Sequence, residues 1–259
     1  HNQRELDSDI YNLINKYVDG FIHLGNYSYS TYINSTIFRS KKNVLIYHPD
    51  YFNIENKVSK SEARKHLGLD KNLHLFLSFG IIRTQEEENF LIKAFKQLKL
   101  EKKTLIIPNS YTLKNKTGYS KPLMKIKYYI RKYLLKRKHI IIDENYIADN
   151  FIQYYMNAAD IVISPRLNTL NSGVVIMGFS FSKIIIGPSI GNIKELLELN
   201  GNPTFNPNDA SSLTKAMEQA IHNHSNIGLK NKEFIELQCN FKKIGLQHIE
   251  FYKKVIDAN

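Results

Sequence analysis

The stretch NTLNSGVVIMGFSFSKIIIGP, residues 168–188, decides the fold. It begins with polar residues, turns at Asn-Ser-Gly and continues through an apolar segment that ends at Gly-Pro. A helix formed after the turn would have no polar face, so it must be buried on most sides. We expect Asn171 or Ser172 to be its N-cap, and KIIIGP at 183–188 to form a buried strand after it.

Short apolar runs of the same kind recur along the chain. They are GFIHL (20–24), NVLIY (43–47), LHLFLSF (73–79), KTLIIP (103–108), HIIID (139–143) and DIVISP (160–165). Nearly all are followed by apolar residues at helical spacing, most clearly in 8–18, 59–69, 87–99, 209–224 and 241–257. Continuous apolar runs that alternate with helices predict an α/β fold with a doubly wound, Rossmann-like parallel sheet.

Composition narrows the classes of partner. The single cysteine, Cys239, excludes an intramolecular disulfide and a cysteine cluster for zinc, which fits a reducing compartment. The formal net charge of +12 favours phosphate-bearing partners or anionic membrane surfaces. The sequence contains no run of about 18 apolar residues, so it predicts no membrane-spanning helix. We therefore expect a cytoplasmic protein, associated at most with the cytoplasmic face of a membrane.

The Asn-Ser-Gly turn is a candidate anion site. Ligands of doubly wound sheets bind at the carboxyl ends of the strands, where helix amino termini present free backbone N–H groups. Gly173 lets a ligand approach the backbone closely, and Ser172 adds a hydroxyl. The alternative is that these residues only cap a buried helix, since serine and asparagine are common caps.

The order of segments around this turn resembles the donor domain of GT-B fold glycosyltransferases, of the large group like family 4. The resemblance is closest over about residues 139–221, from YYMNAADIVISP through NSG and IGNIKE to NPNDASSL. It is looser at LFLSFGIIRTQEEENFLIKAFKQL, which is similar to the first donor-domain strand and its phosphate loop. Residues 1–55 resemble the end of the acceptor domain and the interdomain crossing, which implies an incomplete N-terminal domain. Residues 56–240 would be the donor domain, and 241–259 a C-terminal amphipathic helix.

The resemblance assigns candidate site residues. Those expected at the donor diphosphate are Gly80, Arg83, Asn171, Ser172, Gly173 and Val174, and Arg166 is a second cation at the same pocket mouth. Those expected in the donor sugar and nucleotide pocket are Gly191, Asn192 and Glu195. Arginine suits a diphosphate because its planar guanidinium makes bidentate contacts. No catalytic residue is assigned within the chain, and none of the spacings predicts a metal site.

The chain departs from the family pattern at three positions. Leu170 and Gly178 stand where the family commonly has two glutamates around the helix start, and Glu86 stands where a lysine usually follows the arginine. Two hypotheses remain. The first is a glycosyltransferase, of the hexosyl or a related class, moving a sugar from a nucleotide-diphosphate sugar to a glycan or lipid-linked acceptor in surface polysaccharide biosynthesis, without a cofactor. The second is a degenerate, non-catalytic binding or scaffold protein.

Segment 116–138 predicts a helix with a basic face, since it carries nine lysines and arginines. A solvated surface, an anionic membrane and nucleic acid are the alternatives for that face, but no nucleic-acid-binding module accompanies the charge, so we expect no nucleic acid. His48, in YHPD at the interdomain crossing, is a candidate for a role in the cleft.

Overall fold

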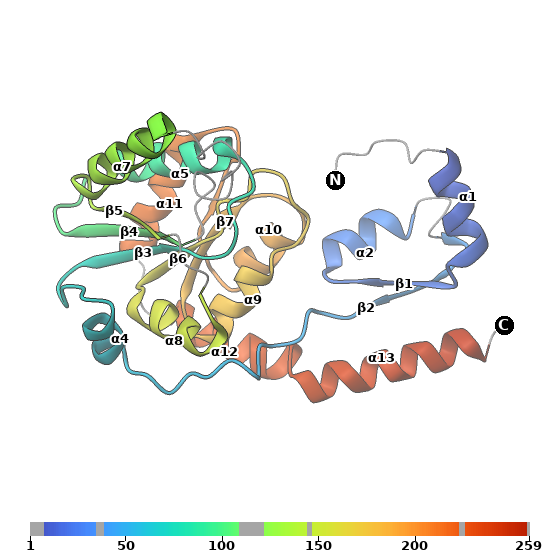
Figure 1. Ribbon diagram of the computed structural model, residues 1–259. Coiled ribbons are helices and arrows are strands. Elements are labelled where there is room, and N and C mark those ends of the chain that lie inside the picture. Colours follow the sequence, from blue (N-terminus) through green and yellow to red (C-terminus); the bar gives the residue numbers. More distant parts are fainter. Residues whose placement is uncertain (1–7, 35–38, 109–121, 144–146, 223–225, 258–259) are drawn as a thin grey trace.

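The computed structural model describes residues 8–34, 39–108, 122–143, 147–222 and 226–257, and divides them into a large and a small unit (Figure 1). The large unit contains a six-stranded sheet in the order β5-β4-β3-β6-β7-β8, in which every neighbouring pair is parallel. Its strands are β3 (His74–Ser78), β4 (Lys103–Pro108), β5 (Ile140–Asp143), β6 (Ile161–Ile163), β7 (Ile184–Pro188) and β8 (Thr204–Phe205). The predicted doubly wound, Rossmann-like sheet is confirmed.

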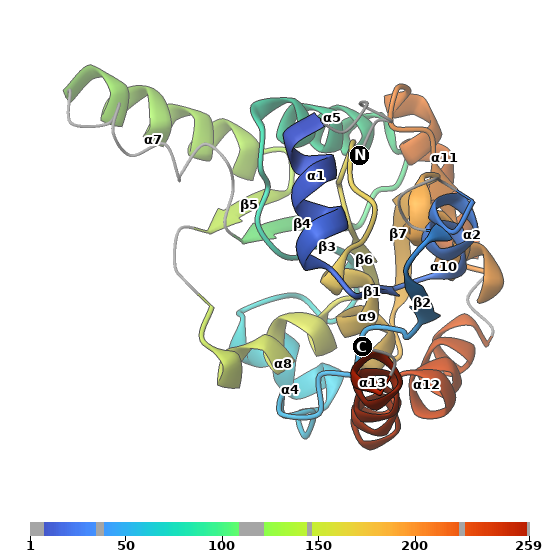
Figure 2. The ribbon, with the colours of Figure 1, turned by 90° about the vertical axis from the view of Figure 1, so that its right-hand side faces the viewer.

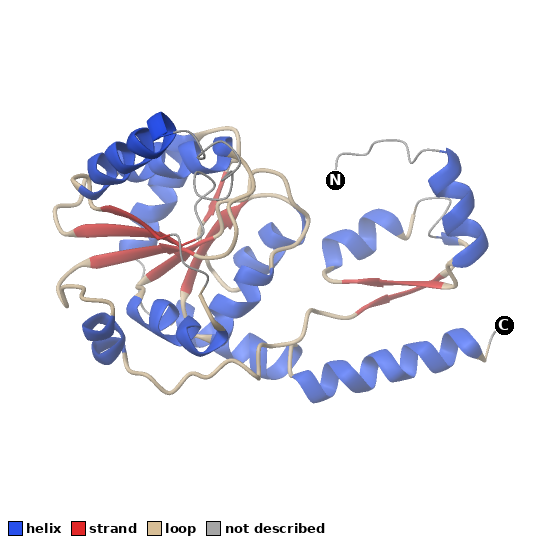
Figure 3. Ribbon diagram, in the orientation of Figure 1, coloured by secondary structure: helices blue, strands red, loops and turns tan. Residues whose placement is uncertain are grey.

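Helices cover both faces of this sheet (Figure 3). One face packs against α5 (Gln85–Gln97), α7 (Pro122–Lys136) and α11 (Ala210–His222). The other packs against α4 (Lys60–His66), α8 (Asp149–Ala158), α9 (Gly173–Ser180), α10 (Gly191–Leu199) and α12 (Ile227–Gln238). Along β3, Phe76 belongs to the first core, while Leu75 and Leu77 belong to the second. Strands buried on both faces must be apolar at successive positions, which explains the continuous apolar runs.

Local signals set several helix ends. α4 begins with a capping box, in which Ser59 and Glu62 bond each other's backbone amides. α5 begins two residues earlier than expected, because the side chain of Thr84 is its N-cap and accepts a hydrogen bond from the Glu87 amide at 3.1 Å. α9 is buried from Val175 to Phe179, as its uniform apolar sequence predicted.

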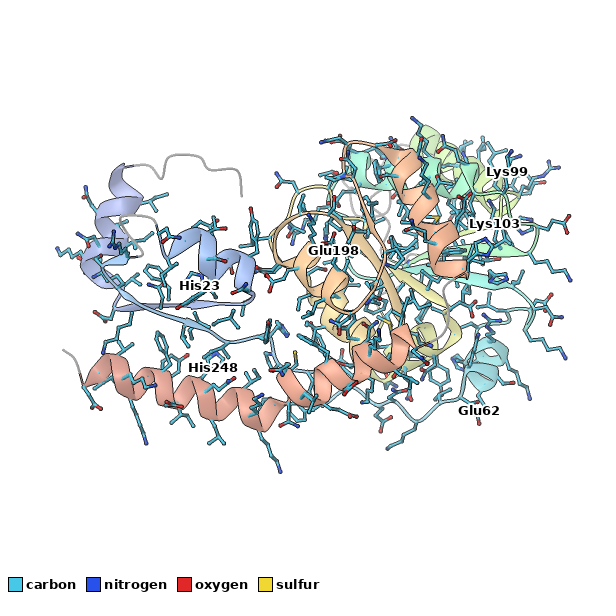
Figure 4. The ribbon with its side chains drawn as sticks, turned by 180° about the vertical axis from the view of Figure 1, so that it is seen from behind. His23, Glu62, Lys99, Lys103, Glu198 and His248 are labelled. Atoms are coloured by element: carbon cyan, nitrogen blue, oxygen red, sulfur yellow. The ribbon has the colours of Figure 1, made fainter. Side chains whose placement is uncertain are left out.

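The small unit combines residues from both ends of the described chain. It contains α1 (Ser8–Tyr17), β1 (Gly20–His23), α2 (Asn26–Tyr32) and β2 (Lys42–Leu45), and its two strands are parallel. The long helix α13 (Phe241–Ile256) lies along this unit rather than against the large sheet (Figure 1). His23 and His248 both belong to this unit, whereas Lys99 and Lys103 lie at the far end of the molecule (Figure 4).

The small unit has its own core. Ile46, Ile244 and Phe251 are buried together, and Val44 and Val255 pack against them. A Cβ added to Gly20 would lie 2.8 Å from Cζ of Phe251, so a larger residue there would require Phe251 to shift. The last helix is therefore a structural part of the first segment's fold.

An ion-pair network, in which Arg64 is buried and Lys60 is exposed, joins α4 to the amino-terminal edge of the sheet. Asp160 accepts hydrogen bonds from Lys60 Nζ at 2.5 Å, Arg64 Nη2 at 2.7 Å and the Leu75 amide at 2.7 Å. Burial raises the pKa of the Asp160 carboxyl, but these three donors outweigh it and hold the pKa below its ordinary value.

Lys183 lies beside this network at the same edge. Its Nζ donates to the backbone oxygens of Asn157 and Ala159, at 3.3 and 3.1 Å, and so closes the carboxyl end of α8. Burial, together with the charges of Lys60 and Arg64, lowers the pKa of the Lys183 amine to about 8. None of the helices among the described residues is long and apolar enough to cross a membrane.

Candidate functional site

The carboxyl ends of β3, β6 and β7 meet at one edge of the sheet, where α9 begins. The register pairs Ser78 of β3 with Ile163 of β6, so the loops that follow these strands leave the sheet side by side. The amino terminus of α9 lies after the second of these loops. This is the place where doubly wound sheets bind ligands.

Gly80 brings the loop after β3 onto the start of α9. Its φ of 86° is a left-handed conformation that favours glycine. A Cβ added to it would lie 3.0 Å from Cγ2 of Val174. Two residues predicted at the diphosphate, far apart in sequence, are therefore in contact distance.

Arg83 and Arg166 both lie at the mouth of this corner but differ in their partners. Arg166, on the loop after β6, is largely buried and forms an ion pair with Glu87, with 3.2 Å between Nη1 and Oε2. Burial lowers the pKa of the Arg166 guanidinium, and the nearby charge of Arg83 lowers it further, against the effect of Glu87. Arg83 is exposed, and its side chain has no hydrogen-bond or ion-pair partner within the described ranges. The free cation at this mouth is thus Arg83.

The acidic run at the start of α5 is largely neutralised. Glu87 accepts hydrogen bonds from the Arg83 amide at 2.8 Å and from Arg166. Glu88 is fully buried and pairs with Arg131 of α7 at 2.7 Å, while Glu86 is exposed. Two of the three carboxylates are therefore committed to arginines, which reduces their repulsion of an anion at Arg83.

Ser172 is the N-cap of α9 by backbone position, but its hydroxyl does not cap the helix. Ser172 Oγ lies 3.1 Å from Ser164 Oγ, at the end of β6. Gly173 faces Tyr51, because a Cβ added to the glycine would lie 2.5 Å from the tyrosine hydroxyl. The glycine thus makes room for a phenol of the crossing segment in this structure.

His48 and Tyr51 lie on the segment that crosses between the two units, and both face the start of α9. Their rings stack with centroids 5.5 Å apart, and burial raises the pKa of the Tyr51 hydroxyl. His48 Nδ1 lies 2.7 Å from the Pro49 carbonyl oxygen, which can only accept, so Nδ1 carries a proton and Nε2 is the acceptor of the neutral ring. His48, Asn171, Ser172 and others line a cavity of about 30 Å³. His48 thus lines this cavity, and its role in the cleft stays a prediction. No local pattern identified Tyr51.

Asn192 and Glu195 hold the small unit against the large one. Glu195 accepts hydrogen bonds from the amides of Asn26 at 3.1 Å and Tyr27 at 2.5 Å, at the start of α2. Asn192 Oδ1 accepts from the Ser28 amide at 2.9 Å, and its Nδ2 donates to Asn171 Oδ1 at 2.7 Å. Sequence reasoning did not include this role, and the assignment of both residues to the donor pocket stays a prediction.

Gly191 starts α10 in a left-handed conformation, with a φ of 56°. A Cβ there would lie 3.0 Å from the Leu170 carbonyl oxygen, which also accepts a hydrogen bond from the Asn192 amide at 3.1 Å. The glycine turn is therefore locked to the loop before α9. Within the described part of the chain, no three His, Cys, Asp or Glu side chains gather as a metal would require.

The strand order and the position of this corner define the class of fold. The chain has the GT-B glycosyltransferase fold, which it shares with several solved structures. No protein-family model matches the chain, and neither does any curated protein at a significant level.

Three of these structures show the extent of the likeness. Sucrose-phosphate synthase from Thermosynechococcus elongatus is 16% identical with a TM-score of 0.76, covering 100% of this chain and 64% of its own. A glycosyltransferase from Rickettsia africae is 16% identical with a TM-score of 0.77, covering 98% and 69%. HepE from Anabaena, in complex with UDP and glucose, is 19% identical with a TM-score of 0.74, covering 95% and 66%. The chain thus spans about two thirds of the length of these structures.

Proposed function

We propose that this chain is the donor-binding part of a glycosyltransferase that moves a sugar from a nucleotide-diphosphate sugar to a glycan or lipid-linked acceptor. We place the reaction in surface polysaccharide biosynthesis. The observation that carries the proposal is the contact of Gly80 with Val174 at the start of α9, together with the nearby guanidinium of Arg83, which has no ion-pair partner among the described residues. A similar structure, HepE, was determined with UDP and glucose.

The chemistry follows from where negative charge develops. An acceptor hydroxyl attacks the anomeric carbon, the bond from that carbon to the diphosphate breaks, and the diphosphate leaves with the extra charge. The first backbone N–H groups of an α-helix have no acceptor within the helix, so those of Gly173 and Val174 suit a phosphate oxygen. Arg83 adds a charge-assisted hydrogen bond. The scheme uses no cofactor besides the donor, because these groups carry the charge stabilisation.

The size of the inner cavity constrains where the donor binds. A cavity of about 30 Å³ has room for one or two water molecules but not for a nucleotide sugar, whose sites are roughly ten times larger or more. The donor therefore binds outside this cavity, on the side of Ser172 that faces Arg83, or the two units separate to admit it.

Calorimetric titration of the chain with UDP, GDP and related nucleotides tests the proposal. We expect Arg83→Ala to weaken binding by about ten- to a hundredfold, since a charge-assisted contact contributes about 1.5–3 kcal/mol. The effect should shrink as salt rises, because Arg83 is exposed. Arg39→Ala, which removes an exposed arginine of the small unit, is the matched control and should leave affinity unchanged.

Two results would contradict the proposal. Binding that survives Arg83→Ala would place the diphosphate elsewhere. The absence of binding by any nucleoside diphosphate at millimolar concentration would instead support the non-catalytic scaffold hypothesis.

A further inference from the structure

The outer face of α7 carries apolar side chains in solvent. Five large ones are between 52% and 66% exposed: Ile126, Tyr129, Ile130, Tyr133 and Leu134. Leu135 is 6% exposed and lies on the side of the helix that packs against the core of the sheet. Ile126 precedes it by nine positions, or about two and a half turns, so their side chains point in opposite directions.

These five side chains form one stripe. At 3.6 residues per turn they span an arc of about 140°, and the edge of this arc at Ile130 and Leu134 borders a groove against α5. Figure 2 shows α7 extending beyond the rest of the large unit. Single exposed apolar residues are normal on a soluble protein, but a continuous patch marks an interaction surface.

Basic residues surround the stripe. Lys136 lies along one side of it, Arg137 lies within its arc and Lys138 follows directly, and all three side chains are exposed. The sequence from 116 to 138 contains nine lysines and arginines and not one aspartate or glutamate, although residues 116–121 lie outside the described ranges. Lys93 and Lys96 of α5 line a groove of about 700 Å³ beside α7, together with Ile130 and Leu134.

We propose that α7 docks on an anionic lipid bilayer. The apolar stripe would lie in the boundary between headgroups and acyl chains, with the two tyrosines at headgroup level and the basic side chains on lipid phosphates. The positive charge of α7 favours an anionic bilayer over a second copy of the chain, because two copies meeting through α7 would bring like charges together. The charge also matches an anionic leaflet, where each basic residue near the surface contributes about fivefold in affinity.

Vesicle co-sedimentation with the whole chain tests the docking. We expect binding to phosphatidylcholine vesicles that contain about one third phosphatidylglycerol, and little binding to phosphatidylcholine alone. Lys136→Gln, Arg137→Gln and Lys138→Gln together should weaken binding about a hundredfold. Ile130→Ser, Tyr133→Ser and Leu134→Ser together should weaken it by at least about a hundredfold, because three inserted side chains are lost.

The matched control removes exposed apolar residues from another helix. Leu246→Ser with Ile249→Ser on α13, at 68% and 52% exposure, should bind vesicles as the parent does. All variants change exposed positions, so their thermal unfolding should match the parent and separate lost docking from lost folding.

Three outcomes would overturn the proposal: no binding to anionic vesicles, equal binding to neutral ones, or binding unaffected by either triple variant. Concentration-dependent self-association that the apolar triple variant abolishes, without vesicle binding, would assign the surface to a second copy. The assay contains no nucleotide sugar, so its result is independent of the proposed transferase activity.

Discussion

Replacing Asn192 by alanine should loosen the small unit from the large one. Asn192 is 1% exposed, and its side chain bonds the Ser28 amide and hydroxyl on one side and Asn171 on the other. Alanine would leave the Ser28 N–H without its acceptor and the Asn171 oxygen without its donor. Because an unsatisfied buried group costs about 1–3 kcal/mol, we expect a loss of about 2–4 kcal/mol in the free energy of unfolding.

Urea and thermal unfolding would measure this loss. For a chain of this size the expected fall in melting temperature is roughly 5–15 °C. Asn72→Ala, at an exposed asparagine, is the matched control and should change stability by less than about 0.5 kcal/mol. Limited proteolysis of α2 should also accelerate in Asn192→Ala alone. If stability and proteolysis both match the control, the side chain of Asn192 does not hold the two units together and our reasoning fails.

Three further substitutions test individual groups by equilibrium unfolding. The pKa of Asp160 is depressed in the folded state, so its carboxylate contributes to the free energy of unfolding above the ordinary pKa of 3.8, and this contribution is lost as pH falls further. Asp160→Asn should therefore make the free energy of unfolding depend less on pH below about 4. Lys183 has a folded pKa of about 8 against an ordinary 10.5, so the parent should gain stability relative to Lys183→Met as pH rises between these values; a constant difference would contradict this. The hydroxyl of Ser78 is buried with no partner among the described residues, so Ser78→Ala should raise stability by about 1 kcal/mol, and a loss would reveal an unseen partner.

Most of the fold could be predicted because its elements carry local signals. The continuous apolar strands and the cap at Ser59 depend on neighbouring residues only. The sequence pattern did not place helix α2, with the sequence NYSYSTY, since it has no apolar periodicity. Its first amides bond Glu195, 168 and 169 positions away, and no local pattern records such a partner.

The sequence predicted which residues lie at the candidate site but not which of them form ion pairs or contacts with each other. The loop after β3 supplied Arg83, and the loop after β6 supplied Arg166, as the sequence indicated. Glu87 decides which of the two is free, and that depends on how close α5 lies to the second loop. Tyr51 was missed for the same reason, because its hydroxyl reaches Gly173 only through the path of the crossing segment.

The return of α13 to the small unit has a consequence for biosynthesis. Ile46 is buried against Ile244 and Phe251, about 200 positions later in the chain. During synthesis at about 5–20 residues per second, β1 and β2 therefore wait on the order of ten seconds or more for the helix that completes their core. The large sheet, whose strands all lie between these segments, can form in that interval. Ribosome-bound chains that end before residue 241 should then be protected from protease across the large sheet, while β1 and β2 are still cleaved.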